Sequence, residues 1–301
     1  MKEIKGIIPI LATPFTSAGD VDYDGLKKLV RHLIKQDVDG ITLFGVASEF
    51  HKLSDDEKKN MQEVFLNEVE KRGSDIFSMI SITEHATFLA QKRAKEAEEM
   101  GASSLMLLPP FFLSPALDDI IHHIKAVASV VSIPIIVQYA PNQTGVPISA
   151  DVFLEINQEF ENIQFIKVEN QPPGRYVTKL AEGSNGILKS LVGYAGIQMP
   201  DVFRRGAVGV QPGSSFIEIY VELYKLYTEG KQDEFTKLFN RLLPYISYWM
   251  QDSELIIKAE KEILKRRGII ESAYCRKPAF DLDEIEIQMI DKFFHEFNEF
   301  F

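Results

Sequence analysis

The stretch Ile-Gln-Phe-Ile-Lys-Val-Glu-Asn at residues 163–170 decides both the fold and the chemistry that the sequence predicts. It is an apolar run of β-branched and aromatic residues, which is typical of a buried strand, and Lys167 lies inside it. Burial disfavours the charged form of an amine and leaves a neutral group that can attack a ketone and form a Schiff base. The alternative is that Lys167 ends the strand and its amine reaches solvent along the aliphatic chain.

Similar apolar runs alternate with longer amphipathic ones from residue 6 to about residue 210, as in repeated βα units around a parallel sheet. We predict eight strands, at 7–12, 40–44, 76–80, 104–108, 134–138, 163–168, 187–192 and 208–211. The helices between them are expected at 24–36, 54–71, 84–100, 116–130, 149–160, 172–182 and 195–205. Ser54 with Glu57 fits a capping box, and Ser149 is placed to cap its helix in the same manner. Eight such units predict a (β/α)8 TIM barrel rather than an open doubly wound sheet.

After residue 213 the pattern becomes wholly helical, with apolar residues at helical spacing. Helices are expected at 214–228, 232–250, 253–267 and 283–298. We therefore predict a barrel over residues 1–213 and a helical appendage over 214–301 that completes and extends it.

Composition excludes several classes of function. The formal net charge of −11 argues against nucleic acid or an anionic membrane as a partner. A single cysteine, Cys275, cannot form an internal disulfide, so a reducing cytoplasm fits best. No apolar run approaches the length of a membrane span or of a signal peptide. We expect a cytoplasmic protein with a small-molecule partner.

Active sites of TIM barrels form where the strands end, so the residues that follow each strand carry the functional prediction. Lys167, Tyr139 and the pair Ser48–Glu49 would then point into one opening. A neutral lysine supplies a nucleophile, a phenol can relay protons, and a hydroxyl beside backbone N–H groups can hold a carboxylate. Such a site activates a 2-keto acid. The structural alternatives are a rim aromatic for Tyr139, a turn former for Ser48 and a packed acid for Glu49.

Two other constellations compete with this interpretation. Lys189 also lies in a predicted strand and is a rival Schiff-base lysine. Gly193, Gly196 and Gly213 after the last two strands would suit a phosphate-binding barrel.

Histidines do not suggest a metal site. His122 and His123 are adjacent on a predicted helix and therefore face apart. His51 and His85 follow strands without a second ligand at metal spacing, so we expect them at the surface and predict no metal.

Several motifs carry a family resemblance that covers nearly the whole chain: residues 6–9 with 13–15, residues 45–49 with 53–54, 139–141 with 144–145, 165–167, and 206–210. On these the chain resembles the dihydrodipicolinate synthase and N-acetylneuraminate lyase family of class I aldolases. The resemblance implies that Lys167 is the Schiff-base lysine and Tyr139 the proton-relaying tyrosine. It also implies a homotetramer, as a dimer of dimers, with no metal or organic cofactor. With the resemblance included, the candidate substrate-binding residues are Ala47, Ser48, Glu49, Gln143, Glu169, Gly193 and Val210.

Departures from the family pattern point to a particular branch. Val46 and Ala47 replace two threonines, and Gln143 replaces an arginine that would grip a second carboxylate. Phe111 and Phe112 replace a tyrosine pair and are candidate subunit contacts. These changes argue against the synthase itself, whereas Ser48–Glu49, residues 137–141 and residues 167–169 resemble more closely the branch that dehydrates or cleaves 2-keto-3-deoxy sugar acids. We therefore expect a lyase that acts on such an acid or on pyruvate. The alternatives are dihydrodipicolinate synthase itself and a catalytically silent barrel that binds a keto acid.

Overall fold

The structure is a computed structural model that describes residues 3–71 and 76–301. Among these residues eight strands form one sheet in the order β1-β8-β7-β6-β5-β4-β3-β2, with parallel pairing from β3 to β8. Helices follow the strands, so the predicted (β/α)8 TIM barrel with C-terminal helices is confirmed. The strands are β1 Gly6–Ile7, β2 Gly40–Leu43, β3 Phe77–Ile82, β4 Ser104–Leu107, β5 Ile135–Tyr139, β6 Ile163–Val168, β7 Lys189–Val192 and β8 Gly209–Val210.

Strand β6 has the predicted bounds, whereas other strands differ at their ends. The strand expected at 7–12 is wrong, because β1 stops at Ile7 and Pro9 has no N–H to donate to a ladder. Only an isolated bridge between Ile10 and Thr42 follows it. Strand β7 begins at Lys189 rather than at residue 187.

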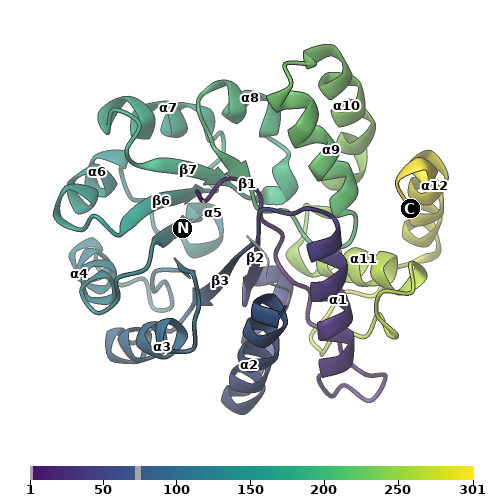
Figure 1. Ribbon diagram of the computed structural model, residues 1–301, viewed down its shortest axis with the longest axis horizontal. Helices are drawn as coiled ribbons and strands as arrows, with labels where there is room; N and C mark the ends of the chain where they lie inside the picture. Colours follow the sequence, from purple (N-terminus) through teal and green to yellow (C-terminus); the bar gives the residue numbers. More distant parts are fainter. Residues whose placement is uncertain (1–2, 72–75) are drawn as a thin grey trace. The chain divides into compact units, whose positions relative to one another are not determined.

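The chain packs as two compact units. The first combines the residues up to Gly6 with Phe77–Gln211. It contains β3 to β8, whose outer face is covered by helices (Figure 1). These helices are α3 Thr87–Glu99, α4 Leu117–Ala128, α6 Ala150–Glu159, α7 Gly174–Gly183 and α8 Met199–Arg204, whereas the short helix α5 Pro141–Thr144 follows the carboxyl end of β5. Register places Met106, Ile136, Phe165 and Leu191 together on the opposite, inner face, where all four are buried.

The second unit combines Ile7–Ile76 with Pro212–Phe301. In it α1 packs against α2, and α10 packs against both α9 and α11. A cluster of buried rings from Phe216, Tyr245, Trp249 and Phe293 joins α9, α10 and α12. The helices are α1 Tyr23–Lys35, α2 Asp55–Lys71, α9 Ile217–Thr228, α10 Gln232–Trp249, α11 Ser253–Arg266 and α12 Glu284–Glu296.

Helix ends test the predicted caps. The capping box is confirmed, because the Ser54 N–H donates to Glu57 and the Glu57 N–H donates to Ser54 Oγ. Ser149 stands at the first position of α6, but its side chain makes no capping bond. The helix expected at 195–205 begins only at Met199, because the backbone before it is left-handed. Within residues 3–71 and 76–301, no helix has the length and apolar character of a membrane span.

Removing the Phe293 ring should destabilise the second unit. Phe293 is fully buried and contacts Phe216, Tyr245 and Trp249, so Phe293→Ala leaves a cavity and should cost about 3–5 kcal/mol. Urea unfolding measures the loss. Ile285→Ala on the same helix is the control, because Ile285 is exposed and its truncation should cost less than about 0.5 kcal/mol. Equal losses in the two variants would contradict the packing described.

Candidate active site

Lys167 is buried near the carboxyl end of β6, with only 2% of its surface exposed. Its Nζ lies 3.3 Å from Oε1 of Glu169. Because residues two apart in a strand share a face, both side chains project to the same side of the sheet. The predicted burial of Lys167 is confirmed, and the alternative of an amine in solvent is wrong. The amine forms an ion pair with this acidic partner, which differs from the isolated neutral amine that burial alone predicts.

The Glu169 carboxylate is held on its other side by Gln138 of β5, whose Nε2 donates to Oε2 over 2.6 Å. Gly193, directly after β7, has no Cβ and so leaves space for the carboxylate. A Cβ at that position would lie 1.8 Å from Glu169 Oε1, so any side chain there would force the carboxylate out of its place. Residues from three neighbouring strands therefore fix one buried amine and one carboxylate in contact.

Tyr139 lies on the other face of the sheet. Register pairs Gln138 with Lys167 and Tyr139 with Val168. Since successive side chains alternate between faces, Tyr139 points away from the amine. Its ring stacks on Tyr176 of α7 with 4.7 Å between ring centroids, and burial raises the pKa of its phenol. This differs from the prediction that Tyr139 and Lys167 point into one opening: the inward residue of β5 is its neighbour, Gln138.

Val210 shows the same shift by one position. It pairs with Val192, which is on the outward face, so the predicted contact of Val210 with substrate through its side chain does not fit. Gln211 follows it and is buried on the inner side, where its Nε2 lies 3.4 Å from Met79 Sδ. Sequence reasoning missed Gln138 and Gln211. Both residues follow once the strands are aligned: Gln138 pairs with Lys167, and Gln211 is two residues after Gly209, which pairs with the inward Leu191.

Gln143 and Tyr194 meet at the carboxyl ends of β5 and β7. The Gln143 Nε2 donates to the Tyr194 hydroxyl. Tyr194 and Ala195 have left-handed backbones, with φ of 51° and 48°, a conformation that costs a non-glycine residue roughly 1–3 kcal/mol. Burial raises the pKa of the Tyr194 phenol, the charge of Glu169 raises it further, and the Gln143 bond partly offsets both. A half-buried phenol thus lies within electrostatic reach of the carboxylate.

Phe111 and Phe112 pack against His85 rather than into the sheet. The His85 and Phe111 ring centroids are 4.7 Å apart, and His85 Nδ1 accepts from the Phe111 N–H over 3.3 Å. Phe112 and Leu113 are 71% and 85% exposed. An apolar loop, residues 111–113, therefore stands at the surface of the first unit.

Ala47 and Ser48 belong to the second unit. The Ser48 hydroxyl donates to the Leu11 carbonyl over 2.6 Å, and the Thr13 hydroxyl donates to the Ser48 carbonyl over 2.5 Å. Ser48 is fully buried and its proton is already used. These contacts support the structural alternative for Ser48, and the half-buried Ala47 offers only a methyl group and its backbone.

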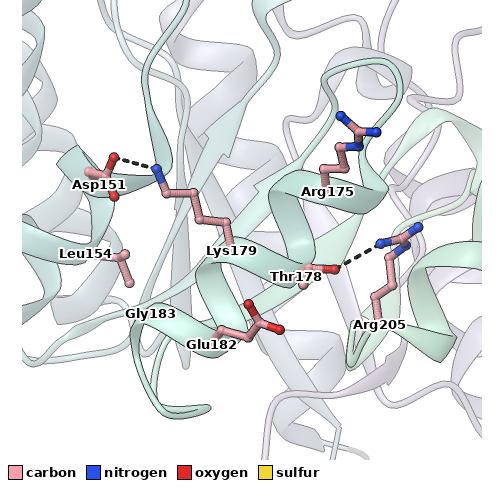
Figure 2. A pocket seen from close by; sticks show the side chains of 8 residues that line it. All are labelled: Asp151, Leu154, Arg175, Thr178, Lys179, Glu182, Gly183 and Arg205. Atoms are coloured by element: carbon pink, nitrogen blue, oxygen red, sulfur yellow. Dashed lines mark hydrogen bonds and ion pairs between the residues drawn. The ribbon is translucent and has the colours of Figure 1, made fainter.

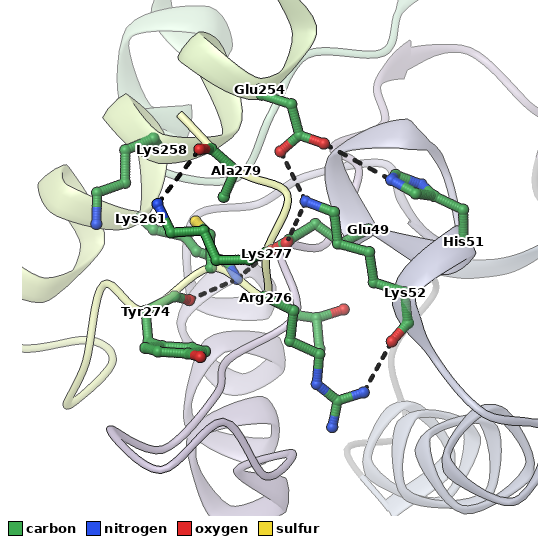
Figure 3. Close-up of polar contacts among 12 residues, drawn as sticks. Glu49, His51, Lys52, Glu254, Lys258, Lys261, Tyr274, Arg276, Lys277 and Ala279 are labelled. Atoms are coloured by element: carbon green, nitrogen blue, oxygen red, sulfur yellow. Dashed lines mark hydrogen bonds and ion pairs between the residues drawn. The ribbon is translucent and has the colours of Figure 1, made fainter. Parts of the chain in front are cut away.

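Glu49 is the centre of a buried charge network (Figure 3). Its carboxylate contacts Lys261 of α11 and lies 3.1 Å from Lys52, which in turn lies 2.7 Å from Glu254. Lys261 also donates to the Tyr274 carbonyl over 3.0 Å, and burial lowers the pKa of its amine. The network joins the loop after β2 to α11. This arrangement supports the packed-acid alternative for Glu49 over an acid–base role.

The rival lysine is at the wrong end of its strand. Lys189 is the first residue of β7, and its amine lies 2.6 Å from Glu3 with 31% of the side chain exposed. Strands of a TIM barrel carry their chemistry at the carboxyl end, so this position argues against Lys189 as the Schiff-base lysine.

His51 and His85 are exposed, as predicted. His123 is buried against the Thr87 hydroxyl, and burial lowers its pKa to about 4. Across residues 3–71 and 76–301, no three or more histidine, cysteine or acidic side chains gather as metal ligands would.

Glu260 of α11 is a second buried acid beside a glycine. Its Oε2 accepts from the Ser214 N–H over 3.0 Å, and a Cβ at Gly213 would lie 1.7 Å from Oε1. Burial raises the pKa of Glu260 to about 8. Acidic side chains thus fill the space at both Gly193 and Gly213, which argues against the phosphate-binding alternative.

An open groove of about 320 Å³ lies on the outer surface of the first unit (Figure 2). Two of its charged groups have partners within it: Lys179 lies 2.5 Å from Asp151, and Arg205 donates to Thr178 over 3.1 Å. The groove is formed by α6, α7 and α8, on the face away from Lys167, so we assign it no role in the chemistry.

The proton on Glu260 should make stability depend on pH. The folded protein holds this proton up to about pH 8, whereas an unfolded glutamate has an ordinary pKa near 4.5. The stabilisation is therefore complete below about pH 4.5 and is lost as the pH rises towards 8. Relative to Glu260→Gln, the wild-type free energy of unfolding should fall by roughly 1.4 kcal/mol per pH unit in this window. Urea unfolding of both proteins at several pH values measures it; parallel profiles would contradict it.

Comparisons with known proteins find a matching family model, similar sequences and similar solved structures. The family model described as "Dihydrodipicolinate synthetase family" matches residues 3–296. An L-2-keto-3-deoxyarabonate dehydratase from Azospirillum brasilense is 25% identical over 92% of this chain and 89% of its own. A 4-hydroxy-tetrahydrodipicolinate synthase from Parabacteroides distasonis is 27% identical over 79% of this chain and 82% of its own. The solved structure of the 4-hydroxy-tetrahydrodipicolinate synthase from Methylacidiphilum fumariolicum SolV superposes with a TM-score of 0.88 at 27% identity, covering 99% of this chain and 97% of that one.

Proposed function

Because the chain belongs to the dihydrodipicolinate synthetase family, we propose that it is a lyase that forms a Schiff base between Lys167 and a 2-keto acid. One observation carries the proposal: a buried amine at the carboxyl end of β6 with a carboxylate 3.3 Å away. An isolated buried amine would have no local proton acceptor, and a surface pair would be solvated. A buried pair at a strand end provides both the nucleophile and a base for it.

Glu169 would prepare Lys167 for attack. The amine must lose a proton before it can add to a carbonyl, and Oε1 of Glu169 is positioned to take that proton. Gln138 occupies the other carboxylate oxygen, Oε2, and so keeps Oε1 turned towards the amine.

The amine then adds to C2 of the keto acid, the carbinolamine loses water, and an iminium forms. The iminium draws electrons from C3, so a base can remove a C3 proton to give an enamine.

A 2-keto-3-deoxy sugar acid is the substrate class that we favour, with pyruvate as the minimal substrate. The polar groups at the carboxyl ends of β5 and β7 include Gln138, which contacts Glu169, and the hydrogen-bonded Gln143 and Tyr194; all three are neutral and suited to hydroxyl groups. The relative from Azospirillum brasilense is named as a dehydratase of such an acid. From the enamine, loss of the C4 hydroxyl gives dehydration; alternatively, breaking the C3–C4 bond gives aldol cleavage.

Dihydrodipicolinate synthase activity is the second candidate, because other relatives are named as 4-hydroxy-tetrahydrodipicolinate synthases. That reaction needs a site for a second carboxylate, and Gln143 offers a neutral amide rather than a guanidinium. A catalytically silent keto-acid-binding barrel is the third. We propose no metal or organic cofactor for the reaction, since the lysine itself supplies the electron sink.

Borohydride reduction with pyruvate should attach the keto acid covalently to Lys167. Peptide mass mapping would locate it, and Lys167→Arg should abolish both labelling and turnover, because a guanidinium remains charged. Lys189→Met is the matched control and should retain turnover within about twofold. Labelling at Lys189, or binding of pyruvate in calorimetry without any labelling of Lys167, would contradict the proposal.

We propose a homotetramer whose subunits meet through the apolar loop 111–113. Three consecutive apolar residues, two of them largely exposed, are a surface that association would cover. The position of this loop after β4 also agrees with the subunit contact that the sequence predicted. A cytoplasmic location, supported by the single cysteine, is part of the same proposal.

Charge in the apolar loop should break the assembly. The double variant Phe112→Asp with Leu113→Asp places two unpaired carboxylates in the proposed contact, so light scattering should show a lower mass than the wild type. Ile285→Asp, which adds charge at an exposed site on α12, should leave the mass unchanged. A double variant that keeps the wild-type mass would rule out this loop as the contact.

A further inference from the structure

Tyr194 and Gln143 bridge the two strands that flank the reactive one. Gln143 follows β5 and Tyr194 follows β7, and these are the two neighbours of β6 in the sheet. The hydrogen bond from Gln143 Nε2 to the Tyr194 hydroxyl therefore connects the strands on both sides of Lys167 and Glu169. Neither residue has a part in preparing the amine.

The position of Tyr194 is set by its surroundings. Gly193, directly before it, lies against the Glu169 carboxylate. Tyr194 itself and Ala195 hold left-handed backbones, which a tyrosine adopts only where neighbouring contacts impose it. The hydrogen bond from Gln143 holds the phenol at the carboxyl ends of β5 and β7, within electrostatic reach of Glu169.

The direction of the hydrogen bond leaves the phenol as a donor. Gln143 donates to the phenolic oxygen, and a second hydrogen bond, with Asn142, acts on the phenol in the same sense, as a donor does, so neither contact uses the proton of Tyr194. Burial and the Glu169 charge both raise the pKa of this phenol, so the proton is retained at neutral pH. The Glu169 charge also disfavours a second carboxylate nearby, and a hydroxyl group is a better partner for this donor.

We propose that Tyr194, positioned by Gln143, is the acid that protonates the leaving C4 hydroxyl of a 2-keto-3-deoxy sugar acid bound on Lys167. This inference rests on the proposed function and adds the acid for its dehydration step. In the step, the enamine electron pair forms the C3–C4 double bond and regenerates the iminium while the C4–O bond breaks. The phenolic proton joins the departing oxygen, water leaves, and the phenolate regains a proton from solvent. No oxidation or reduction occurs.

Two assays separate this role from the chemistry of Lys167. With L-2-keto-3-deoxyarabonate as the probe, Tyr194→Phe should lower kcat about 100-fold or more, with KM changed by less than about threefold. Borohydride trapping of pyruvate on Lys167 has no leaving hydroxyl, so its rate should stay within about twofold of the wild type. Tyr194→Phe should also remove the alkaline limb of the kcat profile, which a merely structural residue would not affect.

Tyr139→Phe is the matched control, because that phenol faces α7 and should leave both assays within about twofold. An unchanged kcat in Tyr194→Phe would overturn the inference, as would a parallel loss of trapping. A wild-type protein that traps pyruvate but does not dehydrate the sugar acid would overturn it while the Schiff-base function stands. Failure of the wild type to trap pyruvate would instead overturn the proposed function and the inference with it.

Discussion

The contact between Lys167 and Glu169 is the constraint on which the neighbouring residues depend. Breaking a buried ion pair by removing one partner costs about 3–5 kcal/mol, so the surrounding side chains must preserve it. Gln138 satisfies the second carboxylate oxygen, and Gly193 leaves the space that the first one occupies. Tyr194 is the residue after Gly193, so it lies just beyond the carboxyl end of β7. The packing of this region and the proposed reaction therefore both depend on the contact between Lys167 Nζ and Glu169 Oε1.

The second unit also contains a buried contact between glutamate and lysine, but the partners of its carboxylate are different. Glu49 is fully buried and is contacted by two lysines, Lys52 and Lys261, whereas Glu169 has one amine, one amide and a side chain that is 11% exposed. The Glu49 carboxylate is fully buried between two cations, an arrangement suited to a structural ion pair. The Glu169 carboxylate can exchange a proton with a bound molecule, whereas the Glu49 carboxylate holds the loop after β2 to α11.

Sequence reasoning predicted the fold and Lys167 because both follow from strong local patterns: eight alternating units, and the cost of a lysine in an apolar run. It placed Tyr139 and Val210 one residue away from the inward positions, since a shift of one residue exchanges the two faces of a strand. The Ser48 hydroxyl was misjudged because its partner, the Leu11 carbonyl, is distant in sequence. Tyr194 was missed because its left-handed backbone leaves no sequence signal.

The central claim is that the Glu169 carboxylate takes the proton from Lys167, and replacing it by an amide of the same size tests this most directly. The measurement is the single-turnover rate of Schiff-base formation with pyruvate, followed by borohydride quenching at successive times. In Glu169→Gln we expect this rate to fall about 100-fold or more, because the amide cannot accept the proton. A rate equal to that of the wild type would show that Lys167 loses its proton without Glu169 and would contradict the claim.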